Sequence, residues 1–252
     1  MLKPKITKIV NEFFVIGGNH DSDQFQLIRN QLLDVLREEE FLLSEHVDEN
    51  VILAKDVIRY IDASSLYAEE TNLRKAYTQI KPFFSRLVNS SWNYYDIQLL
   101  AGSIEYTETA TQAIELATKA QEYINIFKRV RSTDALEALL AVNLCSRILI
   151  AKYFDDQVET SLVIEFQKGL KKLENLVKHN QELAMLLLIT KIRQALLSEH
   201  DSRAQTLCEE LEFQYDKQIG ATIRNEVEFY QQQRKIKRKT GLHESSRVQK
   251  VL

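Results

Sequence analysis

The chain contains very few residues that break helices. Only 6 Gly and 2 Pro occur among its 252 residues, although sheets and their hairpins normally use such residues at many turns. Apolar residues instead recur three and four positions apart, and strict alternation of apolar and polar residues is absent over any useful length. The pattern therefore predicts an all-α protein without a β-sheet.

Segments with this helical period follow one another along the chain at intervals of roughly 20 residues, which predicts about ten or eleven helices. Short loops between them make neighbouring helices antiparallel. This organisation is typical of a superhelical stack of antiparallel helical hairpins, as in tetratricopeptide-like folds. No exact repeat can be read from the sequence, so the stacking is inferred from helix lengths.

Reactive side chains are scattered. Cys145 and Cys208 lie in segments with apolar periodicity, which predicts buried thiols in a reducing compartment. None of the five histidines lies three or four residues from another His or Cys on a common helix face, so neither a metal nor another cofactor is expected. The cluster Glu199-His200-Asp201 falls between two predicted helices, where polar residues normally cap helix ends rather than catalyse.

Known catalytic and targeting motifs are missing from the sequence. It has no nucleophile elbow, dinucleotide-binding glycine pattern or kinase signature, so we expect a protein that is not an enzyme. No signal peptide opens the chain, and the longest apolar run, Leu183 to Ile189, is too short to cross a bilayer. We therefore expect a cytoplasmic protein with no membrane partner.

Charge is unevenly distributed. Residues 231–252 contain seven Lys or Arg against Glu244 alone, which leaves 26 bases and 35 acids, a net charge of −9, on the rest. An acidic body argues against direct, sequence-specific DNA binding. The basic run from Arg234 to Lys239 could touch nucleic acid, but terminal basic runs are more often solvated ends, so 231–252 are expected to form a flexible tail.

The segment Trp92-Asn93-Tyr94-Tyr95-Asp96-Ile97 contains the only tryptophan. Its rings are most simply explained by core packing, with ligand contact as the alternative. With Leu99 and Leu100 it resembles the Trp-Gly-x-Tyr-Glu-Ile/Leu stretch of the Rgg/GadR/MutR transcriptional regulators of Gram-positive bacteria. Asn93 replaces the usual Gly, and Asp96 the usual Glu.

Other segments that resemble this family follow in matching order, and together they cover roughly Lys5 to Tyr230. Ala141 to Cys145, leading to Tyr153-Phe154-Asp155, is similar to the family's helix with a polar Asn and the turn after it. Two segments near the start resemble the junction between the family's DNA-binding and helical domains: Val10 to Phe14 and Phe25 to Ile28.

The resemblance implies a tetratricopeptide-like domain that dimerises through its C-terminal helices and binds short hydrophobic signalling peptides, as in quorum sensing, on its concave face. Family members begin with a helix-turn-helix, and nothing before Gly17 can form one. On this interpretation residues 1–18 are a remnant linker helix and 19–230 the peptide-binding and dimerisation domain. A homodimer would use Met185 to Ile189, which is apolar around most of a helix.

A peptide groove needs side chains that donate and accept hydrogen bonds together, and a cation for a carboxylate. Asn143 and Arg147, four residues apart on one face of a helix expected from about Asp134 to Phe154, fit such a clamp. Alternatively, Asn143 satisfies a neighbouring helix and Arg147 lies at the rim. The alternative function is a helical scaffold for protein–protein interaction without a pheromone ligand. The candidate peptide-binding residues are Asn143, Arg147, Tyr94, Tyr95 and Trp92.

Overall fold

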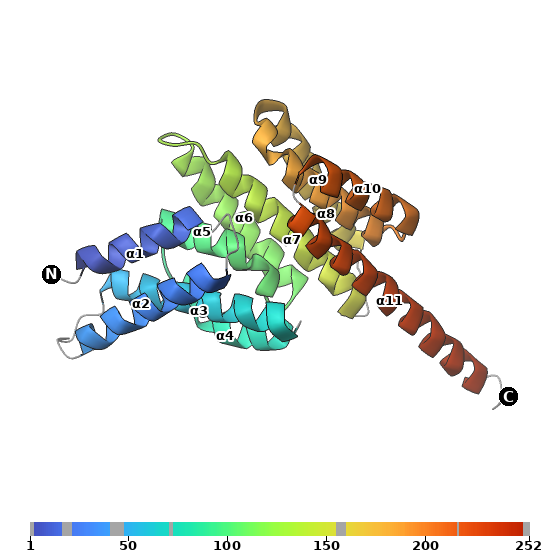
Figure 1. Cartoon of the computed structure of the whole chain (residues 1–252), viewed down its shortest axis with the longest axis horizontal. Helices are drawn as coiled ribbons and strands as arrows, with labels where there is room; N and C mark the ends of the chain where they lie inside the picture. The colour runs from blue at the N-terminus through green and yellow to red at the C-terminus, as the bar shows by residue number, and fades with distance from the viewer. Residues whose placement is uncertain are drawn as a thin grey trace. The chain divides into compact units, whose positions relative to one another are not determined.

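The structure is a computed structural model, and it describes residues 3–16, 22–40, 48–70, 73–154, 160–215 and 217–248. These residues form eleven α-helices and two short 3-10 helices without a strand, which confirms the predicted all-α class (Figure 1). The helices are α1 (Lys3–Ile16), α2 (Ser22–Glu40), α3 (Glu49–Glu70), α4 (Leu73–Val88), α5 (Tyr94–Ser103), η1 (Ile104–Tyr106), α6 (Ala110–Phe127), α7 (Asp134–Phe154), α8 (Thr160–His179), η2 (Gln181–Leu183), α9 (Ala184–Leu197), α10 (Asp201–Gln214) and α11 (Lys217–Val248).

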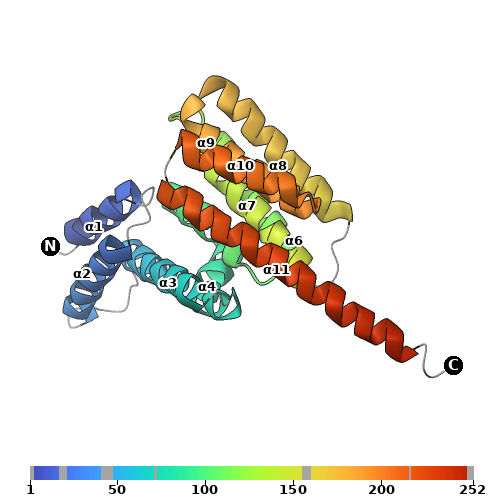
Figure 2. The ribbon, with the colours of Figure 1, turned by 45° about the vertical axis from the view of Figure 1, so that its right-hand side comes forward.

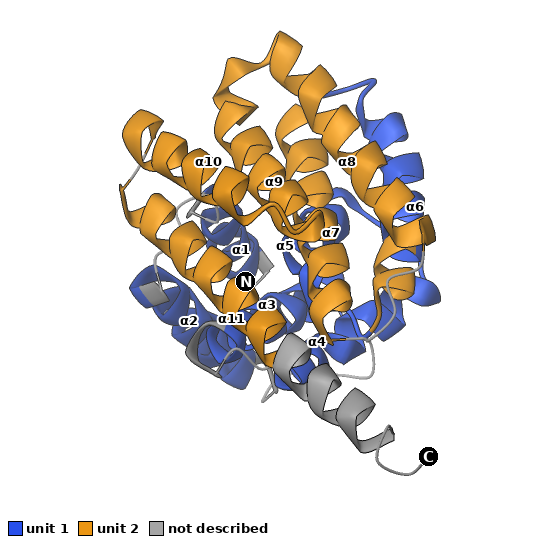
Figure 3. Ribbon diagram, turned by 90° about the vertical axis from the view of Figure 1, so that its right-hand side faces the viewer, with its two compact units in different colours: residues 1–108, 115–131 blue, residues 109–114, 132–252 orange. Residues whose placement is uncertain are grey.

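The chain falls into two compact units (Figure 3). Unit 1 comprises residues 1–108 and 115–131, and unit 2 comprises residues 109–114 and 132–252. The chain passes between the units once inside α6, between residues 114 and 115. The helix stop predicted at Gly17-Gly18-Asn19 lies outside the described residues.

Unit 1 is organised around α3, which packs against α1, α2, α4 and α5. Ala54, Val57 and Ile61 on α3 are fully buried, as the helical spacing of apolar residues in this segment requires. Phe13 of α1 joins the same core, since its ring centroid lies 5.7 Å from that of Tyr60. Consecutive helices α3 and α4 share the most extensive contact of this unit, and α4 continues through Pro82.

Unit 2 is organised around α7, which packs against α8, α9 and α11 (Figure 2). Side chains are buried around almost the whole circumference of α7, from Leu136 to Tyr153. Gly169 lets α8 approach closely, because a Cβ at this position would lie 2.9 Å from the Cys145 Sγ atom. Cys145 and Cys208 are both buried free thiols, and burial raises the pKa of Cys145 to about 12.

Helix α11 extends across part of the segment that the sequence predicted to be a flexible tail. It is assigned from Lys217 to Val248, so residues 231–248 continue a helix that begins within the body of unit 2. Ile223, Val227 and Tyr230 form its buried stripe, and Arg234 extends this stripe by one turn. Among the described residues, no helix is long and apolar enough to cross a membrane.

Candidate functional site

Trp92 lies in the short connection between α4 and α5 and is 4% exposed. Its indole Nε1–H donates a hydrogen bond to the Leu87 carbonyl at 2.7 Å, and its ring stacks on Tyr123 with a centroid distance of 5.3 Å. The Lys119 ammonium lies 4.7 Å from the Trp92 ring centroid and donates to the same carbonyl at 3.0 Å. The indole is therefore packed and satisfied within unit 1.

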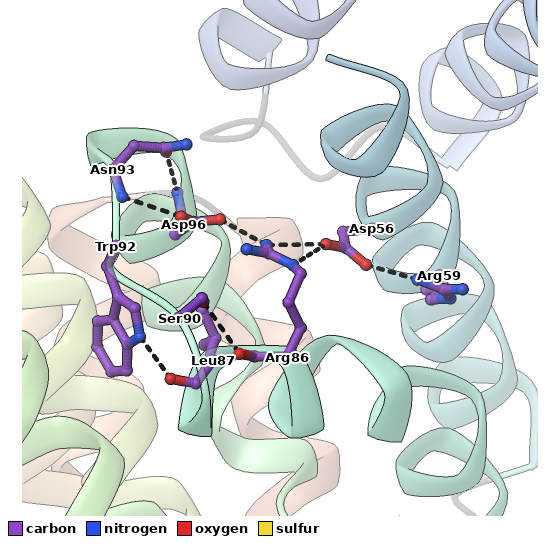
Figure 4. A network of polar contacts seen from close by, with 8 residues as sticks. All are labelled: Asp56, Arg59, Arg86, Leu87, Ser90, Trp92, Asn93 and Asp96. Carbon is purple, nitrogen blue, oxygen red and sulfur yellow. Dashed lines mark hydrogen bonds and ion pairs between the residues drawn. The ribbon is translucent and has the colours of Figure 1, made fainter. Parts of the chain in front are cut away.

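Asn93 and Asp96 form a capping box at the start of α5 (Figure 4). The Asp96 backbone N–H donates to Asn93 Oδ1 at 3.0 Å, and the Asn93 backbone N–H donates to Asp96 Oδ2 at 2.9 Å. These are the two positions at which the segment departs from the Rgg-type pattern. Because the two side chains satisfy each other's backbone donors, the pair sets where α5 begins.

A buried ionic network ties this cap to α3 (Figure 4). Arg86 Nη2 on α4 lies 2.5 Å from Asp96 Oδ1 and 2.8 Å from Asp56 Oδ2 on α3. Arg59 Nη1 lies 2.6 Å from the other oxygen of Asp56. The side chain of Asp56 is 0% exposed and that of Asp96 is 3% exposed. Three helices of unit 1 therefore meet at one guanidinium.

The chemistry of this network fits a role in holding the helices together. Burial raises the pKa of the Asp56 carboxyl, while the charges and hydrogen bonds of Arg86 and Arg59 lower it and offset part of that shift. Both carboxylates already accept hydrogen bonds from arginine, so neither is available as a general base. Sequence analysis missed this network. The available signal was a carboxylate, Asp56, placed within the buried stripe of α3.

Tyr94 and Tyr95 are half-buried on α5. The Tyr94 ring meets Phe127 edge to face at 5.4 Å, and the Arg131 guanidinium lies 4.1 Å from its centroid. Tyr95 stacks on Phe14 at 5.3 Å, and its hydroxyl donates to Asn11 Oδ1 at 2.8 Å. Both rings contact side chains of unit 1, and each remains partly exposed to solvent.

Asn143 and Arg147 lie on α7, whose bounds match the helix predicted from the sequence. Asn143 is half-buried, whereas Arg147 is fully buried, at 0% exposed. Arg147 is therefore not a rim residue, and both residues interact with other residues of the chain. This pair belongs to unit 2, while Trp92, Tyr94 and Tyr95 belong to unit 1.

Glu199 and His200 form the turn between α9 and α10, where the sequence placed them, although the His200 side chain makes no capping hydrogen bond to α10. The His200 backbone N–H donates to the Ala195 carbonyl at 2.8 Å, which closes the end of α9. Glu199 adopts a left-handed backbone with φ of 59°, and its carboxylate lies 3.1 Å from Lys152 Nζ. A glycine normally occupies this position at the end of a helix.

We expect Glu199→Gly to be more stable than Glu199→Ala by about 1 kcal/mol, because glycine relieves the left-handed strain and both variants lose the Lys152 contact. The pair of variants isolates the backbone contribution from the ion pair. Urea denaturation monitored by circular dichroism measures the difference. Equal stabilities would show that the turn is unstrained.

Among the described residues, no group of three or more His, Cys, Asp or Glu is placed to hold a metal ion. Comparisons of the chain with known protein families, with curated proteins and with solved structures found no match.

Proposed function

We propose that the chain is a peptide-binding and dimerisation module of the Rgg/GadR/MutR type, built as a tetratricopeptide-like stack of helical hairpins. The all-helical fold supports this proposal, as do the extensive contacts between consecutive helices α3 and α4, α7 and α8, and α9 and α10. The observation that carries it is Asn143, a half-buried amide on the central, largely apolar helix α7. A side-chain amide can donate to and accept from a peptide backbone.

In this proposal the peptide lies along α7 in unit 2, with Asn143 as the backbone clamp and Leu144, also half-buried, as part of the apolar wall. The full burial of Arg147 assigns it a supporting role behind the clamp. The proposed dimer uses α9, on which Met185, Leu186 and Leu187 stay half-buried within one chain while Leu188 and Ile189 are buried. A transcriptional role would then follow from ligand-dependent dimer geometry.

Asn143→Ala should weaken peptide binding by roughly tenfold or more, because it removes two hydrogen bonds worth about 1 kcal/mol each. The probe is a fluorescein-labelled library of octapeptides rich in Leu, Ile and Phe, measured by fluorescence anisotropy. Asn225→Ala is the matched control, since Asn225 is exposed on α11 and should leave affinity and melting temperature unchanged.

The melting temperature of Asn143→Ala distinguishes a clamp from a packing residue. A clamp variant keeps the wild-type melting temperature and loses affinity. A destabilised protein whose folded fraction binds the library as tightly as wild type would overturn the assignment of Asn143.

One observation favours a second function, that of a helical scaffold for another protein. Helix α7 is closed by packed side chains around most of its circumference, which leaves little open inner face for a small peptide. A scaffold would bind no octapeptide in the library and would show no binding defect in Asn143→Ala.

A further inference from the structure

The exposed face of α8 carries a row of cations beside an open depression. The depression has a volume of about 400 Å³ and is lined by Glu137 of α7 and by Lys168, Lys171, Lys172, Asn175, Leu176 and His179 of α8. Lys168 lies three residues before Lys171 and four before Lys172, so the three lysines lie on one side of the helix. The body of the protein carries a net negative charge, whereas this face is rich in lysine.

Two of the three lysines have partners within the chain. Lys172 Nζ lies 2.7 Å from Oε2 of the buried Glu137, and Glu137 also accepts a hydrogen bond from the Thr133 hydroxyl at 3.0 Å. Lys168 Nζ lies 2.6 Å from Glu165 Oε1 but its side chain is 66% exposed. Among the described residues, no carboxylate lies within ion-pair distance of Lys171. The face therefore has cationic charge that the chain itself does not neutralise.

The helix dipole does not account for Lys168 and Lys171. Cations favour the C-terminus of a helix because of its dipole, and Lys178 and His179 in the last turn of α8 are placed for that effect. Lys168 and Lys171 lie in the middle of the helix, where the dipole gives no such gain. Neighbouring like charges on one face instead repel each other, and an anionic ligand would relieve this repulsion.

The floor of the depression is aliphatic. Leu176 is partly buried and packs against a cluster formed by Ala138, Ala141, Val142, Leu173 and Leu183. Leu186 and Leu187 of α9 are partly buried against the same cluster. A ligand here would meet an aliphatic surface and a cationic row side by side, and an open depression suits a chain lying across it better than an enclosed small molecule.

We propose that this face of α8 binds an acidic peptide, with a ligand carboxylate against Lys168 and Lys171 and an aliphatic side chain against Leu176. The inference rests on the proposed peptide-binding function and names a ligand chemistry for unit 2. Charge complementarity selects the occupant, since Lys168 and Lys171 are both exposed and have only Glu165 between them as an ion-pair partner among the described residues. Lys172 is held by Glu137 and serves mainly to neutralise that buried acid.

The test uses the full chain and two labelled probe peptides, acetyl-(Leu-Glu)₄ and acetyl-(Leu-Gln)₄, followed by fluorescence anisotropy. Lys168→Gln/Lys171→Gln should weaken binding of the Glu peptide about tenfold at low salt, and less at high salt. Lys217→Gln, at an exposed lysine of α11, is the matched control and should change nothing. The Gln peptide should bind more weakly than the Glu peptide and should not respond to the double variant.

Several outcomes would overturn the inference. The double variant could bind the Glu peptide like wild type, or Lys217→Gln could lose as much affinity as the double variant, which would indicate non-specific attraction. If the apolar octapeptide library binds and the Glu peptide does not, this inference fails and the proposed function stands; if neither binds, both fail. Loss of a dimer in the double variant, measured by light scattering with unchanged peptide affinity, would assign the face to a second copy instead.

Discussion

Replacing Arg86 by Met should lower the free energy of unfolding by about 3 kcal/mol. Removing one partner of a buried ion pair leaves an uncompensated charge, which typically costs 3–5 kcal/mol. Arg86 is shared by Asp56 and Asp96, whose side chains are almost fully buried. We expect the lower end of the range because the Arg86 side chain is 25% exposed, so water can reach part of the site.

The control is an exposed pair with the same chemistry. Arg37 Nη1 lies 3.4 Å from Asp34 Oδ1 on α2, and these side chains are 76% and 70% exposed. Arg37→Met should therefore change stability by no more than about 0.5 kcal/mol. Urea denaturation of both variants, followed by circular dichroism, measures the contrast. If Arg86→Met were as mild as Arg37→Met, the network would not hold α3, α4 and α5 together.

The destabilisation of Arg86→Met should depend on pH. The pKa of Asp56 in the folded protein is raised above its usual 3.8 by burial, and Arg86 opposes that rise. A raised folded pKa means that folding favours the protonated carboxyl, so its unfavourable effect on stability grows as pH rises from about 3.8 through the folded pKa. Without Arg86 the pKa rises further. The stability difference between wild type and Arg86→Met should therefore be largest near neutral pH and shrink toward pH 4.

Local patterns predicted the elements of this fold well. The bounds of α7 match those predicted, because its first and last turns are marked by Asp134 and by the apolar period ending at Phe154. The short apolar helix after Trp92 is α5, and its residues Ile97, Leu99 and Leu100 are buried as expected. Helical periodicity depends on residues within one or two turns, so a single sequence carries that information.

Contacts between distant residues were not predicted. Asp56 and Arg86 are separated by 30 positions, and no local rule pairs them. The chain passes between the two units after residues 108, 114 and 131; the second passage lies inside the continuous helix α6, where neither Gly nor Pro marks a break. The capping box at Asn93 and Asp96 was accessible, since an Asn followed three residues later by an acid is a helix-start pattern.

The burial of Arg147 was not predicted from its residue type. A charged side chain suggests an exposed position, but α7 is apolar around most of its circumference and Ile148, Leu149 and Ile150 directly follow Arg147. In such a helix nearly every position is buried, so the environment overrides the residue type. The proposed groove must therefore depend on Asn143 and Leu144 for direct contact.

Arg147→Ala should lower the free energy of unfolding by about 3 kcal/mol or more, because Arg147 is among the largest fully buried side chains. Truncation leaves a cavity where this large side chain packs. A loss of this size corresponds to a fall of about 10 °C in melting temperature for a protein of this length. Arg129→Ala, at an exposed position, should melt like wild type.

Arg147→Met separates the packing of Arg147 from its charge, because methionine keeps much of the aliphatic stem but has no cation. If packing dominates, Arg147→Met should recover most of the stability lost in Arg147→Ala; if charged hydrogen bonds dominate, the two variants should be equally unstable. Either result fits a supporting residue behind Asn143. An Arg147→Ala protein that melts like wild type but no longer binds the apolar octapeptide library would contradict this role and return Arg147 to the peptide groove.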